Sequence, residues 1–123
     1  NGFSLIRKIL AESDKSVDEK KAVATQVLEP TILYPTLISS LLKKHEIKSM
    51  SHITGGGLTE NLPRSIPEKL CIELSVNSWD IPPVFKWLQS EGNIHNDDMY
   101  KIFNCGIGMV LLVDSSQEED IRK

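Results

Sequence analysis

The chain has 123 residues, of which 40% are hydrophobic and 25% are charged, a balance typical of one soluble globular domain with a real core. Its formal net charge of −3 argues against a general nucleic-acid surface, and no apolar run approaches the ~20 residues of a membrane helix. The two cysteines have no Cys or His partner at metal-ligand spacing, so we expect buried, reduced thiols and a cytoplasmic protein.

The first part of the chain is predicted to be helical. Residues 3–10 place their apolar side chains on one face of a helix. Residues 12–21 are almost all polar and indicate either a solvated loop or a frayed helix start. A second short helix over 23–28 is stopped by Pro30. Residues 37–45 then carry the apolar stripe of a third helix, with basic side chains in its last turn.

The middle of the chain contains two predicted strands around a glycine turn. Residues 47–53 favour a short strand, three consecutive glycines follow at 55–57, and residues 58–62 can open a helix. Residues 70–76 alternate apolar and polar side chains, which predicts a strand with one covered face.

The last part alternates again between helix and strand. We expect a helix over 84–92 that ends at a glycine, and a helix over 97–103 that Asn96 caps. Residues 107–113 form a near-continuous apolar run, which is typical of a central strand buried on both faces. Ser116 is the expected cap of a final short helix.

These elements predict a single α+β domain. Three strands with several helices between them favour a layered α/β/α arrangement around a small mixed sheet. In this arrangement the glycine turn lies at the carboxyl end of the first strand, where ligands often bind.

The glycine turn is the strongest candidate for a site. Each glycine costs roughly 0.5–1 kcal/mol against alanine inside regular structure, so three together indicate positive φ angles or the close approach of another group. A strand, a glycine turn and a helix start would expose N–H groups to an anion such as phosphate or carboxylate. A tight connection without a ligand is an equal alternative. The pattern is neither a P-loop nor a dinucleotide-binding fingerprint.

Several polar residues near the turn have two interpretations each. His52 either donates to a phosphate or moves a proton, or it simply packs at the end of the sheet. Glu60 either holds a Mg²⁺-bound ligand or caps backbone N–H groups, and Asn61 lies beside it on the same turn. Arg64 either binds a phosphate or makes a surface ion pair. No catalytic residue and no metal site can be assigned from these residues.

Five blocks, spanning nearly the whole chain, resemble a known family in the same order. They lie at residues 1–8, 28–34, 52–64, 87–93 and 99–110, and HITGGGL at 52–58 is the strongest. The family they resemble is the phosphoribosylformylglycinamidine cyclo-ligases, also called aminoimidazole ribonucleotide synthetases, in their C-terminal domain. Residues 12–21 look least like the family.

The resemblance implies an enzyme of de novo purine biosynthesis. Such a ligase uses ATP and Mg²⁺ to activate the amide oxygen of formylglycinamidine ribonucleotide and to close the imidazole ring of aminoimidazole ribonucleotide. Residues 1–123 would be one domain, the C-terminal half of a two-domain enzyme truncated at both ends. The absent N-terminal domain would bind most of the ATP and Mg²⁺ and would build a homodimer. We therefore expect the isolated chain not to turn over.

The resemblance also assigns residues by position. The glycine turn Thr54, Gly55, Gly56 and Gly57 would bind substrate or phosphate, and Asn1 would lie at the cleft-facing start of the first helix. The second glycine segment would provide close backbone packing beside the cleft through Asn104, Gly106 and Gly108.

Two alternatives stay open from the sequence. One is a sister ATP-dependent enzyme with the same two-domain plan, of the selenophosphate synthetase, thiamine-phosphate kinase or formylglycinamidine ribonucleotide synthetase type. The other is a non-catalytic binding domain.

Overall fold

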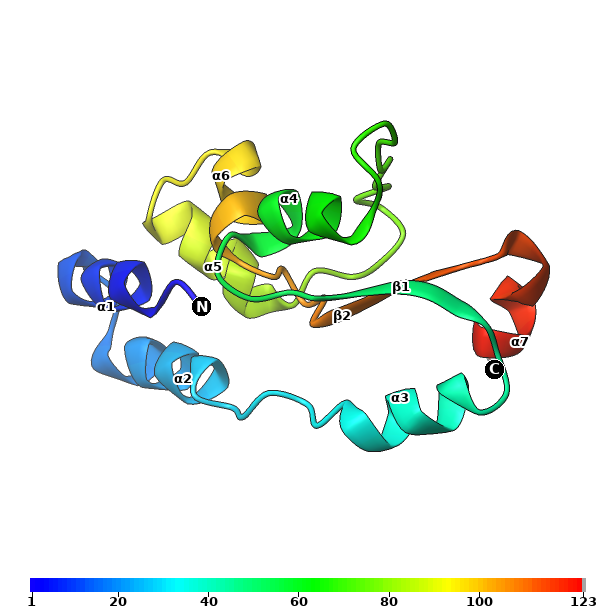
Figure 1. Cartoon of the computed structure of the whole chain (residues 1–123). Helices are drawn as coiled ribbons and strands as arrows, with labels where there is room; N and C mark the ends of the chain where they lie inside the picture. Colours follow the sequence, from blue (N-terminus) through cyan, green and yellow to red (C-terminus); the bar gives the residue numbers. More distant parts are fainter. Residues whose placement is uncertain (123) are drawn as a thin grey trace.

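The computed structural model describes residues 1–122 of the chain (Figure 1). In chain order the elements are α1 (Phe3–Glu12), α2 (Val17–Val27), α3 (Pro35–Leu42), β1 (Ile47–His52), α4 (Gly57–Asn61), the 3₁₀ helix η1 (Leu62–Ser65), α5 (Pro83–Glu91), α6 (Asn96–Ile102), β2 (Met109–Val113), the 3₁₀ helix η2 (Ser115–Gln117) and α7 (Glu118–Arg122). Among the described residues no helix combines the length and the apolar character needed to cross a membrane.

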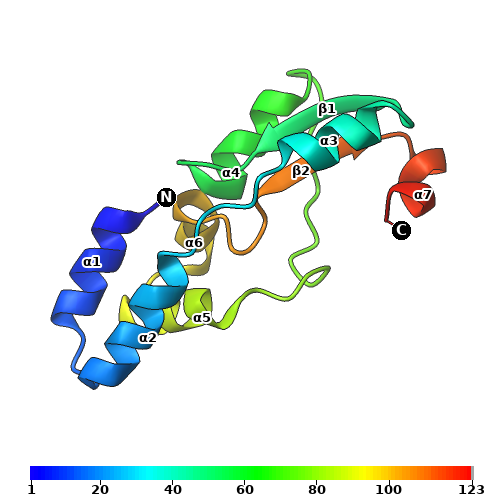
Figure 2. The ribbon, with the colours of Figure 1, turned by 90° about the horizontal axis from the view of Figure 1, so that it is seen from below.

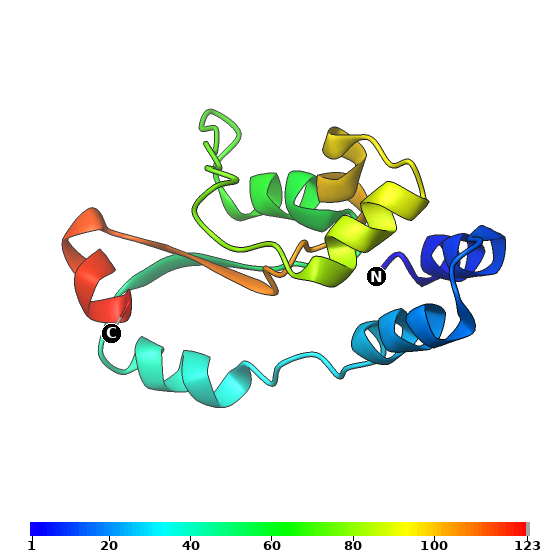
Figure 3. The ribbon, with the colours of Figure 1, turned by 180° about the vertical axis from the view of Figure 1, so that it is seen from behind.

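The two strands form an antiparallel pair with helices on both sides. Ile47 lies opposite Val113 and His52 opposite Met109, with a bulge after Ile47. Helices α4, α5 and α6 lie on one side of the pair and α3 on the other (Figures 1 and 3). Helices α1 and α2 form a hairpin at the end of the molecule that is remote from α7 (Figure 2). The glycine turn, which follows β1, therefore lies at the end of the strand pair that is remote from α7 (Figure 1).

Two apolar clusters hold this arrangement together. The larger one joins α1, α5 and α6 through Ile6, Ile9, Leu88, Met99, Phe103 and Cys105. The smaller one consists of Ile53, Leu58 and Leu62, from the two sides of the glycine turn in sequence, with Trp79 and Tyr100 packed against it. Fully burying one such side chain stabilises a protein by about 1.5–3 kcal/mol, so the smaller cluster fixes the start of α4 against β1.

The expected helices are present, and the polar stretch 12–21 resolves into two parts. Helix α2 begins at Val17 because the Ser16 side chain caps it, accepting the Glu19 N–H at 3.2 Å. The loop before it and the helix start after it are both solvent-facing, as their charges predict. Helix α6 begins at Asn96, with His95 rather than Asn96 as its cap.

The predicted third strand over 70–76 is wrong. This segment is extended, but it pairs with neither strand among residues 1–122, and the Leu70 side chain is 61% exposed. Cys71 is exposed, contrary to the prediction for both cysteines, whereas Cys105 is buried as expected. Alternation in a sequence reports only that side chains point in opposite directions, and here the apolar side chains line a cavity although the backbone pairs with no strand among residues 1–122.

The α+β class is confirmed, whereas the mixed character of the sheet is not. Because segment 70–76 does not join it, the sheet of residues 1–122 consists of β1 and β2, which pair antiparallel. Strand β2 is half-buried, with Leu112 exposed, so the prediction of a central strand buried on both faces is also wrong. A two-stranded pair has no central strand, so each strand keeps an open edge.

Candidate functional site

The residues after β1 form a hydrogen-bonded turn that requires glycine at its third position. The Ile53 N–H donates to the Gly108 carbonyl at 2.9 Å, which ties the start of the turn to the segment before β2. The Gly57 N–H then donates to the Thr54 carbonyl at 3.0 Å. Gly56, at the third position, has φ 94° and ψ −4°, the conformation of a type II turn. Backbone geometry therefore accounts for Gly56.

Gly57 is a glycine because helices α4 and α6 approach closely there. It is buried, its φ is +57°, and a Cβ atom at this position would lie 2.2 Å from the Tyr100 carbonyl oxygen and 2.7 Å from that of Phe103. Both are main-chain atoms that cannot move aside as a side chain can. Gly57 therefore serves the packing of α4 against the end of α6.

Gly55 differs from its two neighbours. It is exposed, its φ is not positive, and a Cβ atom there would meet nothing within 4 Å. Neither the backbone nor the packing of the described chain requires a glycine at this position. A side chain is absent where the turn is most open, which suits the close approach of a ligand.

Two asparagine side chains hold the carbonyl groups of the turn. The Asn61 side-chain nitrogen donates to the carbonyls of Gly57 at 2.8 Å, Gly55 at 3.1 Å and, more weakly, Thr54 at 3.4 Å. The Asn1 side-chain nitrogen donates to the Thr54 carbonyl at 2.9 Å and also to the Ile102 carbonyl. The structure thus brings both asparagines to the turn. The N–H groups of Gly55 and Gly56 have no hydrogen-bond partner within residues 1–122.

Glu60 and Arg64 form an ion pair beside the turn. Their charged atoms lie 3.6 Å apart across one helical turn, and both side chains are largely exposed. A Cβ atom on Gly56 would lie 2.5 Å from a carboxylate oxygen of Glu60, so this carboxylate borders the turn. The negative charge disfavours an anion close to Gly56, and Arg64 offsets part of that effect.

His52 and the second glycine segment meet Tyr34, a residue that the sequence did not single out. The rings of Tyr34 and His52 stack edge to face with centroids 5.8 Å apart. A Cβ atom on Gly108 would lie 1.9 Å from the Tyr34 hydroxyl oxygen, so the glycine makes room for that hydroxyl. The only sequence signal for this contact is the glycine itself.

The rest of the second glycine segment forms a tight loop. The Asn104 side-chain oxygen accepts the Gly106 N–H at 3.1 Å. Gly106 has φ +96°, and a Cβ atom there would lie 2.6 Å from the Pro82 ring. Asn104 and Gly106 therefore shape the chain before β2, and within residues 1–122 neither side chain forms a hydrogen bond with the Thr54–Gly57 turn.

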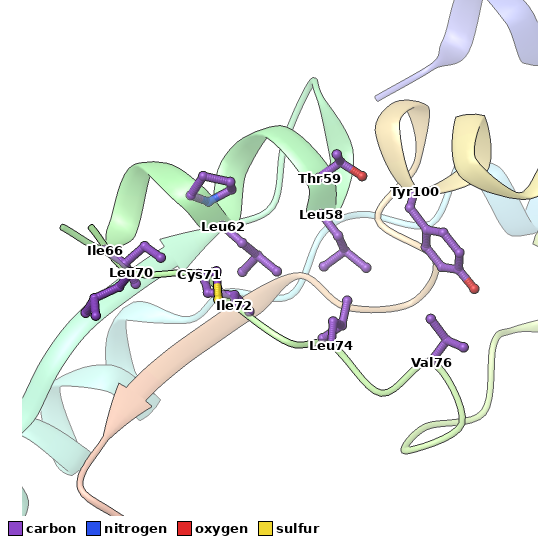
Figure 4. Close-up of a pocket in the computed structure, with 11 residues that line it drawn as sticks. Leu58, Thr59, Leu62, Ile66, Leu70, Cys71, Ile72, Leu74, Val76 and Tyr100 are labelled. Atoms are coloured by element: carbon purple, nitrogen blue, oxygen red, sulfur yellow. The ribbon is translucent and has the colours of Figure 1, made fainter. Parts of the chain in front are cut away.

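An apolar cavity of about 460 Å³ borders α4 (Figure 4). Helix α4, η1, Tyr100 and the extended segment line it, with Leu58, Leu62, Leu74 and Val76 pointing inward (Figure 4). Its lining residues include no charged side chain. This cavity does not suit a phosphate, because its lining is mostly apolar and contains no positive side chain to compensate a buried charge.

Among the described titratable groups with shifted pKa values, Tyr100 borders the turn at Gly57, and burial, with a smaller effect of Cys105, raises its pKa. Burial raises the pKa of the Cys105 thiol to about 11, so the thiol stays protonated and is a poor nucleophile. Hydrogen bonds from Ser116 and from Lys48 lower the pKa of Asp114 to about 2, at the far end of β2. Within the described part of the chain no group of three or more His, Cys, Asp or Glu side chains is placed to hold a metal ion. The turn therefore offers binding groups rather than a general base.

Comparison with known proteins identifies relatives over the whole chain. The family model described as "AIR synthase related protein, C-terminal domain" matches residues 1–123. The phosphoribosylformylglycinamidine cyclo-ligases of Neisseria meningitidis (serogroup C / serotype 2a) and Neisseria gonorrhoeae are each 44% identical over 126 residues, covering 99% of this chain and 37% of the relative. That of Burkholderia cenocepacia is 44% identical over 122 residues, covering 97% of this chain and 35% of the relative. The chain thus spans little more than a third of the length of these relatives.

Proposed function

This chain belongs to the AIR synthase related protein, C-terminal domain family, and we propose that it is the substrate- and phosphate-binding part of a phosphoribosylformylglycinamidine cyclo-ligase. The observation that carries the proposal is the 44% identity to named cyclo-ligases over 99% of the chain. The free space around Gly55 in the structure supports the proposal, because it leaves room for a ligand at the turn. The names of these relatives favour the cyclo-ligase over the sister enzymes and over a non-catalytic domain.

The proposed reaction is the ATP-dependent ring closure of formylglycinamidine ribonucleotide to aminoimidazole ribonucleotide in de novo purine biosynthesis. ATP, when bound with Mg²⁺, supplies the phosphoryl group that makes the amide oxygen of the substrate a leaving group. The part of this chain is to bind the ribonucleotide phosphate through the N–H groups of Gly55 and Gly56 and to hold the substrate in place. Neighbouring N–H groups suit an anion because they donate without adding a mobile charge.

The groups of this chain do not fit a Mg²⁺ site. The acidic side chain nearest the turn, Glu60, is paired with Arg64, and the described residues hold no cluster of acidic ligands. We therefore assign ATP and Mg²⁺ to the portion of the enzyme outside residues 1–123, and we expect that portion to build a homodimer in the cytoplasm. The isolated chain is then inactive, and ring closure catalysed by the purified chain alone would contradict this assignment.

A variant of the whole enzyme that carries this chain tests the proposal. Gly55→Val adds a side chain at the open face of the turn, where the fold has room for it. We expect the KM for formylglycinamidine ribonucleotide to rise about tenfold or more while the KM for ATP stays unchanged, because the new side chain obstructs the phosphate and a hydrogen bond to a charged group is lost. Thr36→Val, at an exposed position of α3, is the matched control and should leave both constants unchanged. An unchanged KM for the ribonucleotide in Gly55→Val would refute the assignment of the turn.

A further inference from the structure

The side chain of Asn61 contacts the glycine turn through three main-chain carbonyls at once. The residue is 7% exposed, and its side-chain nitrogen lies within hydrogen-bond distance of the Thr54, Gly55 and Gly57 carbonyl oxygens. We propose that Asn61 is a positioning residue that turns the N–H groups of Gly55 and Gly56 toward the ligand. The inference rests on the proposed function of the turn, and it adds the residue that orients the N–H donors of the turn.

The direction of these N–H groups follows from the planarity of the peptide unit. In a trans peptide the C=O of one residue and the N–H of the next point in opposite directions. Asn61 holds the Thr54 and Gly55 carbonyls, so the N–H groups in the same peptide units, those of Gly55 and Gly56, must point away from Asn61. Gly55 is exposed and Gly56 is half-buried, so the direction away from the buried Asn61 side chain is the direction toward solvent.

The chemistry of the contact suits an asparagine and few other side chains. Three carbonyl oxygens surround one atom, so that atom must be the nitrogen, because an oxygen there would be repelled by all three. The neutral amide brings two N–H donors into a buried position without the cost of burying a charge. Aspartate has the same shape but, when ionised, only accepts hydrogen bonds.

Asn1 makes a narrower version of the same contact. Its side-chain nitrogen holds the Thr54 carbonyl and no other carbonyl of the turn. It therefore helps to orient the Gly55 N–H but has no hold on the Gly56 N–H. This difference separates the effects of the two asparagines in an experiment.

The test follows the backbone N–H signals of Gly55 and Gly56 by NMR in the 123-residue chain, with inorganic phosphate as the probe. Asn61→Asp should shift both signals and weaken phosphate binding about tenfold or more, because both oriented donors are disturbed. Asn1→Ala should shift the Gly55 signal and leave that of Gly56 in place. Ser51→Ala is the matched control, since the Ser51 hydroxyl donates to the Asn61 main-chain carbonyl at 3.2 Å without touching the turn.

A merely structural role for Asn61 would make Asn61→Asp and Ser51→Ala behave alike, with lower stability but unchanged glycine signals and phosphate affinity. That result would overturn the inference. Asn61→Ala must show the same two effects without an added charge, because the negative charge of Asn61→Asp by itself would repel phosphate and shift nearby signals. A measurement without any variant checks the contact itself: the Asn61 side-chain NH₂ should exchange with solvent far more slowly than that of the exposed Asn96, and fast exchange would remove the basis of the inference. If the wild-type chain binds no phosphate, the proposed function fails, and the glycine signals still decide the role of Asn61.

Discussion

Two alanine substitutions in the same glycine run should have opposite effects on stability. In Gly57→Ala the new Cβ meets the main-chain oxygens of Tyr100 and Phe103 at 2.2 and 2.7 Å, and the residue must also keep a φ of +57°. The left-handed conformation costs about 1–2 kcal/mol and the overpacking about 1–3 kcal/mol, which together give about 2–5 kcal/mol. A whole domain of this kind is stable by only about 5–15 kcal/mol, so this is a large share.

Gly55→Ala should be neutral or stabilising by comparison. Its Cβ meets nothing within 4 Å and its φ is not positive, so the substitution mainly restricts the unfolded chain, a gain of about 0.4–1 kcal/mol. Thermal unfolding followed by circular dichroism measures both. With about 4 °C per kcal/mol for a chain of this size, we expect Tm to fall by roughly 8–20 °C for Gly57→Ala and to rise by roughly 2–4 °C for Gly55→Ala. A Gly57→Ala variant as stable as wild type, or a Gly55→Ala variant that is strongly destabilised, would refute this reasoning.

Three further predictions concern other parts of the molecule. A thiol reagent at neutral pH should label exposed Cys71 in the folded chain and reach Cys105 only after unfolding. Burial raises the Cys105 pKa to about 11 in the folded state, so the free energy of unfolding should fall as pH rises from about 9 to 11. Cys105→Ser should remove that fall. The folded-state pKa of Asp114 is lowered to about 2, so its stabilising effect exists above pH 4, and the Tm difference between wild type and Asp114→Asn should shrink as pH falls from about 4 to 2; a constant difference would contradict the assignment. Gly108→Ala should cost stability because it displaces the Tyr34 hydroxyl, and the cost should largely vanish in a Tyr34→Ala background; equal costs in both backgrounds would show that Tyr34 is not what the new Cβ meets.

The helices and the first strand could be predicted because their signals are local. Apolar side chains at helical spacing mark α1 and α3, and prolines and glycines mark the ends of α2 and α5. The glycine run likewise marks its own turn, because positive φ angles at Gly56 and Gly57 require that residue type.

The failures share a different physical cause. Residues 70–76 alternate as a strand does, yet pairing depends on where other segments lie, and alternation carries no information about that. The prediction of Ser116 as a cap is wrong by two residues: the Asp114 side chain caps η2, which precedes α7, by accepting the Ser116 N–H, and either residue type caps well.

The site was predicted in part for the same reason. The sequence treats Gly55, Gly56 and Gly57 alike. Only the structure shows that a Cβ atom has room at Gly55 and would collide at Gly56 and Gly57. The role of Asn61 and that of Tyr34 depend on contacts between separate segments, which no spacing in the sequence encodes.

The most direct test of the proposed function is a titration of the isotopically labelled chain with formylglycinamidine ribonucleotide, followed through the backbone N–H signals of Gly55 and Gly56. We predict that both signals shift in a saturable manner, and that Gly55→Val abolishes the shift while the remaining spectrum stays that of a folded chain. Binding that leaves both glycine signals unmoved, or no binding at all, would contradict the assignment of the turn Thr54–Gly57 as the phosphate-binding element.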